Sequence, residues 1–335
     1  MKKVLVIGGS GYIGSVLIKD LVLKKNQVTN VDLKIYPDQQ IDFSNGINSE
    51  HFIKLDLRET KKLKKLLSKT DSVVILAGLV GEFITNKYLN LSNSINDKGI
   101  INLIDECENH DNIENVIFVS TCSNYGFTKN QDLVTEEYEL KPLSPYAKAK
   151  VKIEQHILNK KSQPYSATIL RFATAFGYSP RMRFDLTINH FCYSMYKNNM
   201  IQVYDPDTWR PYCHVKDFSR LIIKILDFDK SQVDKKVFNV GSDRNNFSKK
   251  AIVDLILKKL PNTKIILKNG GVDKRDYKVS FNKIKKELNF ETKYSVEDGI
   301  EEILNVLKNE KFKFLEEKKD LSKTRGNFEI LDHVK

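Results

Sequence analysis

The 335-residue sequence lacks the cysteine patterns that cross-link small secreted domains or hold metal ions. None of its four cysteines belongs to a C-x-x-C pair, and the six histidines form no ligand spacing with them. We therefore expect neither disulfides nor a metal site. The cysteines are Cys107, Cys122, Cys192 and Cys213.

Long hydrophobic runs are also missing. No stretch reaches the roughly 20 apolar residues that a bilayer-spanning helix needs. The early run VLVI at 4–7 is soon interrupted by glycines, which is not typical of a signal peptide. Internal repeats and low-complexity linkers are absent too. With 41% hydrophobic and 29% charged residues, the chain is expected to be globular and cytoplasmic, with no membrane partner.

The net charge of +12 comes without the basic and aromatic motifs that recognise nucleic acid. The lysines are spread over helical faces such as KKLKKLLSK at 61–69, which is typical of solvated surface. We expect no nucleic-acid partner.

What the sequence does contain is an alternation of short apolar runs and segments with helical periodicity. Such alternation is typical of a parallel sheet with helices on both faces, in which ligands bind at the carboxyl ends of the strands. The predicted fold class is therefore α/β, a doubly wound Rossmann sheet. The predicted strands are 3–9, 27–33, 52–57, 72–78, 115–121 and 166–173, separated by helices such as 15–25, 61–69 and 96–109.

Three glycines stand where the first predicted strand turns into the first helix. Gly8, Gly11 and Gly14 have G-x-x-G-x-x-G spacing, which permits a tight turn and close approach of a pyrophosphate. Asp32 ends the second strand, where a carboxylate can accept hydrogen bonds from ribose hydroxyls and repel a 2′-phosphate. The pattern predicts a dinucleotide site that favours NAD over NADP, and the nearby Lys34 keeps that preference moderate.

The stretch SPYAKAK at 144–150 predicts a helix start with a tyrosine and a lysine one turn apart. Ser144 can cap the helix and Pro145 suits its first position. A fixed ammonium at Lys150 would lower the pKa of Tyr146 and make it a candidate base. Taken alone, such a pair is also common on solvated helices of a lysine-rich chain.

Together these motifs resemble the extended short-chain dehydrogenase/reductase family, the nucleotide-sugar epimerases and dehydratases, over residues 1 to about 310. The landmarks are GGSGYIG, LDLRE, LAGLVG, NDKGIINLI, STCSNYG and YAKAK. The resemblance implies the cofactor NAD. It implies cofactor contacts from Gly8, Gly11, Tyr12, Ile13, Gly14, Asp32, Asp56, Leu57, Leu76, Ala77, Gly78, Asn96, Tyr146 and Lys150.

The resemblance also assigns the catalytic residues Thr121, Tyr146 and Lys150. Tyr146 would accept a proton from a sugar hydroxyl while the carbon gives a hydride to nicotinamide. Thr121 would align the same hydroxyl, and Lys150 would lower the pKa of the tyrosine and hold the nicotinamide ribose. Without the other two residues, Thr121 would be interpreted as a strand-end hydroxyl that bonds its own backbone.

In the family a smaller carboxyl-terminal domain binds the nucleoside diphosphate. The expected organisation is an NAD domain at 1–174, completed by parts of 211–245, a substrate domain mainly at 175–312 and a tail at 313–335 without a readable motif. Arg210 suits phosphate oxygens, although a surface ion pair is the alternative; Arg181 and Arg183 are weaker candidates. The expected substrate-binding residues are Thr121, Cys122, Ser123, Thr174, Asn189, Arg210 and, more weakly, Arg275.

Two departures from the family pattern narrow the reaction. Dehydratases carry Asp-Glu after the catalytic threonine, whereas this chain has Cys122 and Ser123, which argues against dehydration. Thr174 stands where many 4-epimerases have asparagine, so the sugar is left open. The sequence favours oxidation at carbon 4 by an epimerase of a nucleotide-diphosphate sugar. The alternatives are a 4-dehydrogenase that releases a keto sugar, with a GDP-heptose-like substrate, and a dinucleotide-sensing protein without turnover.

The resemblance also implies a homodimer, formed by pairing of the helices that contain Asn96 and Tyr146. Apolar residues on these helices either form that interface or cover the chain's own sheet. They are Ile100, Leu103, Ile104, Val151 and Ile157.

Overall fold

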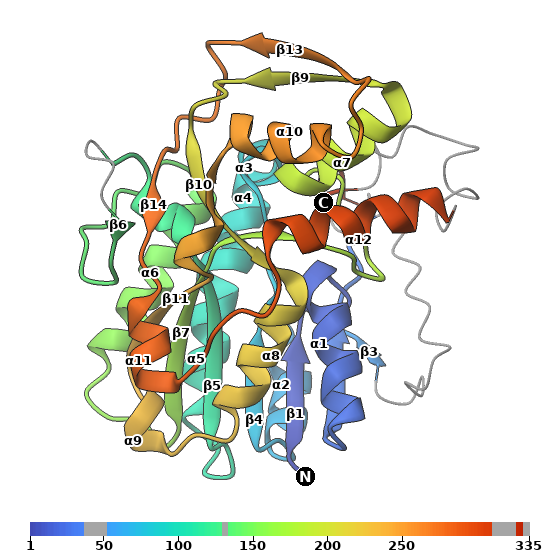
Figure 1. The fold of residues 1–335 in the computed structure, drawn as a ribbon. Coiled ribbons are helices and arrows are strands. Elements are labelled where there is room, and N and C mark those ends of the chain that lie inside the picture. Colours follow the sequence, from blue (N-terminus) through green and yellow to red (C-terminus); the bar gives the residue numbers. More distant parts are fainter. Residues whose placement is uncertain (37–51, 129–132, 310–325, 331–335) are drawn as a thin grey trace.

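The computed structural model describes residues 1–36, 52–128, 133–309 and 326–330. A large sheet lies between layers of helices, and a smaller lobe of short strands and helices lies at one end of it (Figure 1). The predicted α/β fold is confirmed. In the ranges just given, no helix is both long enough and apolar enough to cross a membrane.

Within the described ranges the large sheet has seven strands, in the order β11-β7-β5-β4-β1-β2-β3, and all neighbouring strands are parallel. Every residue of β4, β5 and β7 is buried, which explains why these strands are continuous apolar runs. The chain order reverses between β1 and β4, which leaves a crevice at their carboxyl ends. The strands are β1 (Lys3–Ile7), β2 (Gln27–Asp32), β3 (Phe52–Lys54), β4 (Ser72–Ile75), β5 (Asn115–Thr121), β7 (Ser166–Phe172) and β11 (Lys236–Val240).

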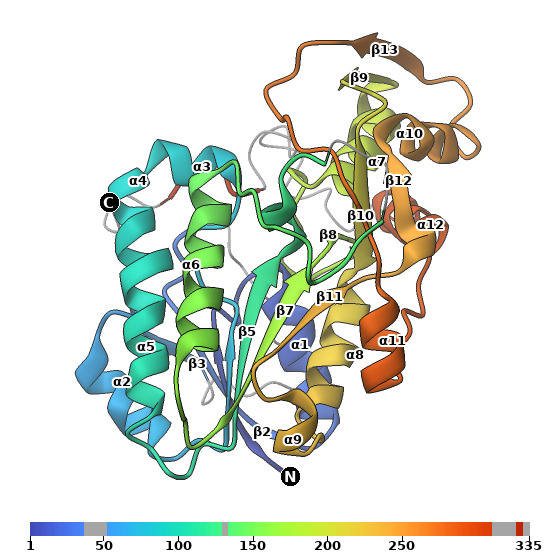
Figure 2. The same ribbon diagram turned by 90° about the vertical axis from the view of Figure 1, so that its left-hand side faces the viewer.

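Helices cover both faces of this sheet (Figure 2). On one face the ring of Phe172 stacks on that of Phe218, 3.8 Å away. Leu103 and Ile153 belong to the apolar cluster on the other face. The first face carries α1 (Tyr12–Leu23), α8 (Val215–Ile225) and α11 (Asn282–Leu288); the second carries α2 (Thr60–Leu67), α5 (Ile100–Cys107) and α6 (Pro145–Asn159). Short helical segments are α3 (Glu82–Lys87), α4 (Leu89–Ser92), η2 (Asn93–Gly99), η3 (Cys122–Tyr125), α9 (Lys230–Val233) and η4 (Asp243–Asn245).

The smaller lobe has its own apolar core, which includes Phe176, Phe184 and Ile300. Its strands are β8 (Thr174–Phe176), β10 (Trp209–His214) and β12 (Asn246–Ser248) in one sheet, the pair β9 (Met200–Tyr204) and β13 (Lys264–Lys268), and the pair β6 (Leu133–Val134) and β14 (Lys278–Val279). Its helices are α7 (Thr187–Asn198), α10 (Lys249–Leu257) and α12 (Val296–Lys308). Because β11 rejoins the large sheet after β10, the chain passes between the lobes more than once; the boundaries at 174 and 312 stay predictions.

The helix predicted at 96–109 is not a continuous α-helix. The segment η2 is a π-helix that leads directly into α5. Such a segment holds an extra residue per turn and so changes the direction of the side chains within it. The spacing of apolar residues in the sequence does not reveal where an α-helix gives way to a π-helix.

The residues considered for a dimer interface mostly cover the chain's own sheet. Ile100, Leu103, Ile104 and Ile157 are each at most 1% exposed in the single chain. Between α6 and its neighbours, Lys152 pairs with Asp97 at 2.7 Å and Lys160 with Asp105 at 2.6 Å. These four apolar residues therefore give no support to the interface, and the fifth, Val151, is partly exposed. The homodimer stays a prediction, which sedimentation of the 38.7 kDa chain at micromolar concentration tests.

Candidate active site

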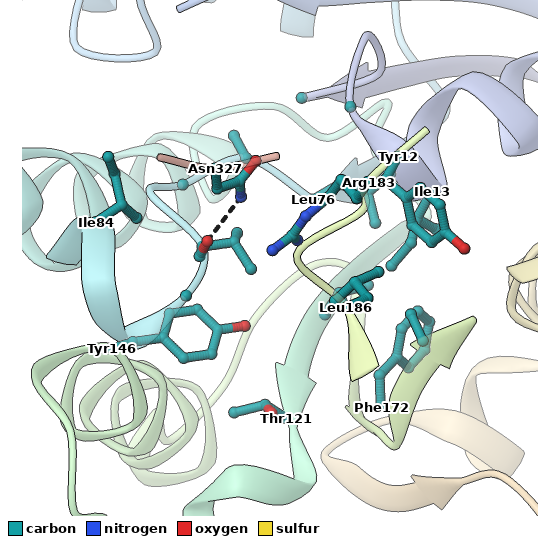
Figure 3. A pocket seen from close by; sticks show the side chains of 18 of the residues that line it. Tyr12, Ile13, Leu76, Ile84, Thr121, Tyr146, Phe172, Arg183, Leu186 and Asn327 are labelled. Carbon is teal, nitrogen blue, oxygen red and sulfur yellow. Dashed lines mark hydrogen bonds between the residues drawn. The ribbon is translucent and has the colours of Figure 1, made fainter. Parts of the chain in front are cut away.

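A cavity of about 620 Å³ lies at the carboxyl ends of the large-sheet strands and extends below the smaller lobe. This is where sheets of this kind bind ligands, and the volume is in the range of small-molecule sites. Figure 3 shows Tyr146 and Thr121 on one side of the cavity, with Arg183 and Asn327 across from them.

The predicted glycine turn forms part of the cavity wall. Gly8 has a φ of +89°, and a Cβ added to it would lie 2.5 Å from the nitrogen of Ala77. A Cβ on Gly14 would lie 2.5 Å from the Cα of Gly9, so the turn admits no side chain at either position. Gly11 immediately precedes α1, and no side chain caps the start of this helix. Uncapped N–H groups at a helix start favour an anion such as a pyrophosphate.

Asp32 lies at the end of β2 in the same cavity. Its carboxylate accepts hydrogen bonds from the backbone N–H groups of Ser10 at 2.9 Å and Lys34 at 2.7 Å. Burial raises the pKa of this carboxyl, and the two hydrogen bonds act in the opposite direction. A carboxylate has about four acceptor positions, so acceptor capacity remains for ribose hydroxyls. Asp56 and Leu57 also line the cavity.

Asn96 supports the cavity from behind and does not line it. Its side chain accepts a hydrogen bond from the Leu79 nitrogen at 2.7 Å and donates one to the Leu79 oxygen at 2.9 Å. A Cβ on Gly78 would lie 2.7 Å from the Asn96 Oδ1. The π-helix η2 thus fixes the segment that follows β4, whose residues Leu76, Ala77 and Gly78 do line the cavity.

These observations fit a dinucleotide. The cradle at Gly8 and Gly14 leaves no room for a side chain, the start of α1 is uncapped, and the Asp32 carboxylate lies at the end of the next strand. The predicted contacts Tyr12 and Ile13 line the same space.

The three predicted catalytic residues meet in this cavity. Thr121 ends β5 and accepts a hydrogen bond from the Ser123 nitrogen at 3.1 Å. Ser144 caps α6 by accepting from the Ala147 nitrogen at 3.2 Å, which places Tyr146 in the first turn. Lys150 is 3% exposed and donates to the Val119 oxygen at 2.7 Å.

The pKa values of this pair differ from the prediction. Burial raises the pKa of Tyr146 to about 12, although Arg183, Arg275 and a hydrogen bond with Thr121 act in the opposite direction. Burial also lowers the pKa of Lys150 to about 7, against the charge of Glu154. With the protein's own groups alone, Lys150 is driven toward neutrality and does not hold the pKa of Tyr146 below its usual value.

Two arginines and an aspartate lie together in another part of the cavity wall. Arg210 lies 3.0 Å from Asp273, and Arg275 donates to both carboxylate oxygens of Asp273 at 2.8 Å. Arg275 also donates to the Ser123 Oγ at 3.0 Å. Burial alone would raise the pKa of Asp273, but the two arginines hold it well below its usual range. Asp273 therefore occupies guanidinium donors that could bind a phosphate.

Other predicted substrate residues divide into two groups. Ser123 and Thr174 line the cavity, whereas Cys122 and Asn189 do not. Cys122 is buried and its Sγ donates to the Arg171 oxygen. Asn189 accepts from the Gly177 nitrogen and donates to the Tyr12 hydroxyl and the Arg183 oxygen, so its side chain is already satisfied inside the protein. Among the described residues no group of His, Cys, Asp and Glu could hold a metal ion.

Arg183, one of the weaker candidates, faces the predicted catalytic residues and pairs with Asp185 at 2.6 Å. Sequence reasoning missed other residues of the wall. Asn327 and Phe328 reach the cavity from a segment in which the sequence shows no motif. The sequence gives no signal for these two, because only long-range packing brings them to the site. The other cavity residues not predicted include Tyr36, Glu82, Asp185, Lys249 and Tyr277.

Known sequences resemble this chain along much of its length. The model of a family described as "NAD dependent epimerase/dehydratase family" matches residues 4–241. UDP-glucose 4-epimerase 2 of Oryza sativa subsp. japonica is 26% identical over 333 residues, 89% of this chain and 80% of the relative. Protein CapI of Staphylococcus aureus is 29% identical over 266 residues, 72% of this chain and 78% of the relative.

Solved structures of both reaction types share the fold. A UDP-glucuronic acid 4-epimerase from Bacillus cereus, in complex with UDP-glucuronic acid and NAD, matches with a TM-score of 0.81, 24% identity and coverage of 92% of this chain and 99% of that one. A dTDP-glucose 4,6-dehydratase from Bacillus anthracis, in complex with NAD, matches with a TM-score of 0.79, 24% identity and coverage of 93% and 98%. The fold alone therefore does not choose between epimerisation and dehydration.

Proposed function

The chain belongs to the NAD dependent epimerase/dehydratase family, and from this premise we propose that it oxidises carbon 4 of a nucleotide-diphosphate sugar as an epimerase. NAD is the cofactor that the family description names, which confirms the cofactor predicted from the sequence. The reaction and the sugar class are the proposal.

One observation carries the proposal: the glycine turn, the Thr121, Tyr146 and Lys150 group, and the arginines share one cavity. A hydride acceptor, a proton acceptor and a diphosphate site are the three elements that oxidation of a nucleotide sugar requires. A dinucleotide-sensing protein would need only the first of them.

Tyr146, Thr121 and the bound cofactor have separate tasks in this reaction. NAD, when bound, supplies the hydride acceptor and the positive charge of its oxidised ring. Tyr146 takes the proton from the sugar hydroxyl as its carbon loses the hydride, and Thr121 holds that hydroxyl. Burial raises the pKa of Tyr146, and the positive charge of the oxidised nicotinamide ring would lower it again. To give the epimer, the keto sugar would turn over, so that its carbon regains hydride on the opposite face and its oxygen regains a proton from Tyr146.

The surroundings of Thr121 support epimerisation over dehydration. Loss of water needs an acid and a base that move a proton beside the sugar. The adjacent Cys122 is buried, and burial raises the pKa of its thiol. Ser123 is engaged with Arg275.

The test is a spectroscopic assay with a panel of UDP-, GDP-, dTDP- and CDP-sugars. We expect one of them to reduce bound NAD, with absorbance at 340 nm that rises only transiently and an epimer among the products. Absorbance that persists until an oxidant is added would instead identify the 4-dehydrogenase. NAD binding without any reduction across the panel would favour the dinucleotide-sensing protein.

Asp32 should set the preference between NAD and NADP. The parent protein should bind NAD more than about tenfold more tightly than NADP, about 1.4 kcal/mol. Asp32→Ala should shrink this ratio, because it removes both the acceptor for ribose hydroxyls and the charge that repels a 2′-phosphate. Titration with both dinucleotides measures it, and Asp254→Ala on the exposed face of α10 is the control. Equal affinities in the parent protein would contradict the prediction.

Arg210 and Asp273 should act on substrate binding in opposite directions. Arg210→Ala should raise KM about tenfold or more with a smaller effect on kcat, because a charged hydrogen bond contributes roughly 1.5–3 kcal/mol. Asp273→Asn should lower KM, because it removes a carboxylate that competes with phosphate for both arginines.

Steady-state kinetics with the sugar nucleotide found above measure both effects. Lys259→Ala, which removes an exposed charge outside the cavity, is the control. A KM unchanged by Arg210→Ala would remove this arginine from the diphosphate site.

A further inference from the structure

The segment 326–330, a part of the stretch in which the sequence shows no motif, packs against the cavity. Its residues contact both lobes at the cavity edge. Asn327 is 5% exposed, and Asn327 and Phe328 form part of the wall that also contains Gly8, Gly11 and Asp32. Figure 3 shows Asn327 across the cavity from Tyr146.

Asn327 joins the lobes by hydrogen bonds. Its Nδ2 donates to the Val80 oxygen at 2.7 Å, which belongs to the large-sheet side. Its Oδ1 accepts from Arg181 at 2.8 Å, and its backbone nitrogen donates to Asp185 at 3.4 Å. One side chain thus connects the segment after β4 to the loop that leads into α7.

Two further contacts hold the segment in place. Glu329 forms an ion pair with Lys87 and accepts a hydrogen bond from the Tyr88 hydroxyl at 2.9 Å. Ile330 is 3% exposed and packs with Tyr36 and neighbouring apolar residues. The five residues of the segment thus make polar, ionic and apolar contacts with the rest of the chain.

The contacts reach the cofactor side of the cavity through Arg181. Its guanidinium lies 4.6 Å from the centroid of the Tyr36 ring. Burial raises the pKa of Asp32, the proposed acceptor for the ribose, and the charge of Arg181 acts in the opposite direction. The segment therefore forms a part of the cavity wall that is held by Val80 and Arg181.

We propose that residues 326–330 form a strap that encloses NAD, so that release of the cofactor requires breakage of the Asn327 contacts. The inference rests on the proposed function, because it takes NAD to be the ligand of this cavity. An enclosed cofactor suits a reaction in which hydride returns within the same site. A merely structural strap would stabilise the fold without changing the rate at which NAD leaves.

The experiment measures that rate. Protein loaded with labelled NAD is mixed with excess unlabelled NAD, and the label retained is followed by rapid gel filtration. A chain ended after Arg325 should release NAD at least about tenfold faster, the equivalent of about 1.4 kcal/mol. Asn327→Ala should release it about fivefold to thirtyfold faster, the equivalent of about 1–2 kcal/mol, because its side chain loses two hydrogen bonds.

Asn262→Ala, the same change at an exposed asparagine outside the cavity, is the matched control and should release NAD at the parent rate. Parent-like release from both the shortened chain and Asn327→Ala would overturn the strap, whatever their melting temperatures. If the shortened chain does not fold, Asn327→Ala decides alone. A parent protein that binds no NAD would overturn the proposed function instead.

Discussion

Tyr146→Phe should lower turnover by ~10² or more, the usual size of a general-base contribution, while NAD stays bound. The change removes the proton acceptor but keeps the ring, which lies in the first turn of α6 beside Thr121. Reduction of bound NAD at 340 nm, measured on mixing with the sugar nucleotide, reports this step directly.

Tyr204→Phe is the matched control, because Tyr204 is 43% exposed and lies outside the cavity. It should retain the parent rate. A Tyr146→Phe protein that reduces its NAD as fast as the parent would exclude Tyr146 as the base. A structure with substrate bound and carbon 4 turned away from the nicotinamide would exclude oxidation at that carbon.

Glu154→Ala should lower the free energy of unfolding by about 3–5 kcal/mol, because it leaves a buried guanidinium without its counter-charge. Arg171 pairs with Glu154 at 2.7 Å, and the two side chains are 5% and 2% exposed. Ser120 and Asn124 donate to the same carboxylate. The network connects α6, which carries the proposed base Tyr146 and also Lys150, to β5 and β7.

Urea denaturation measures this loss. Glu301→Ala is the control, because the exposed pair of Glu301 and Lys259 at 3.2 Å should contribute at most about 1 kcal/mol. The double variant Glu154→Leu with Arg171→Met should recover part of the stability by removing both charges. A loss below about 1 kcal/mol in Glu154→Ala would mean that Arg171 finds enough compensation from Tyr125 and the Glu136 oxygen.

The parts of the site that the sequence predicts are those made by neighbouring residues. Gly8, Gly11 and Gly14 act within one strand-turn-helix unit, and their spacing is visible in the chain. Tyr146 and Lys150 share one helical turn, so their common face follows from helix geometry. The continuous apolar runs of β4, β5 and β7 likewise reveal strands buried on both faces.

The rest of the site depends on contacts between distant segments. Asp273 meets Arg210, and Asn327 meets Arg181, only because the smaller lobe folds over the sheet. Burial is the largest influence on the pKa values of Tyr146 and Lys150. The spacing of two residues along a helix does not show how deeply they are buried. Apolar residues such as Ile100 and Ile157 have the same periodicity whether they cover a sheet or form an interface. Only the structure shows that these two are buried within the chain.

The position of β11 means that the two lobes cannot be separated by cutting the chain once. This strand pairs with β7 along five residues, from Lys236 opposite Thr168 to Val240 opposite Phe172. A fragment that stops at residue 174 would leave β7 as a bare sheet edge, with unpaired N–H and C=O groups beside the apolar sequence SATILRF. Such an edge is a template for intermolecular β-pairing, so the isolated dinucleotide-binding half of this protein would tend to aggregate.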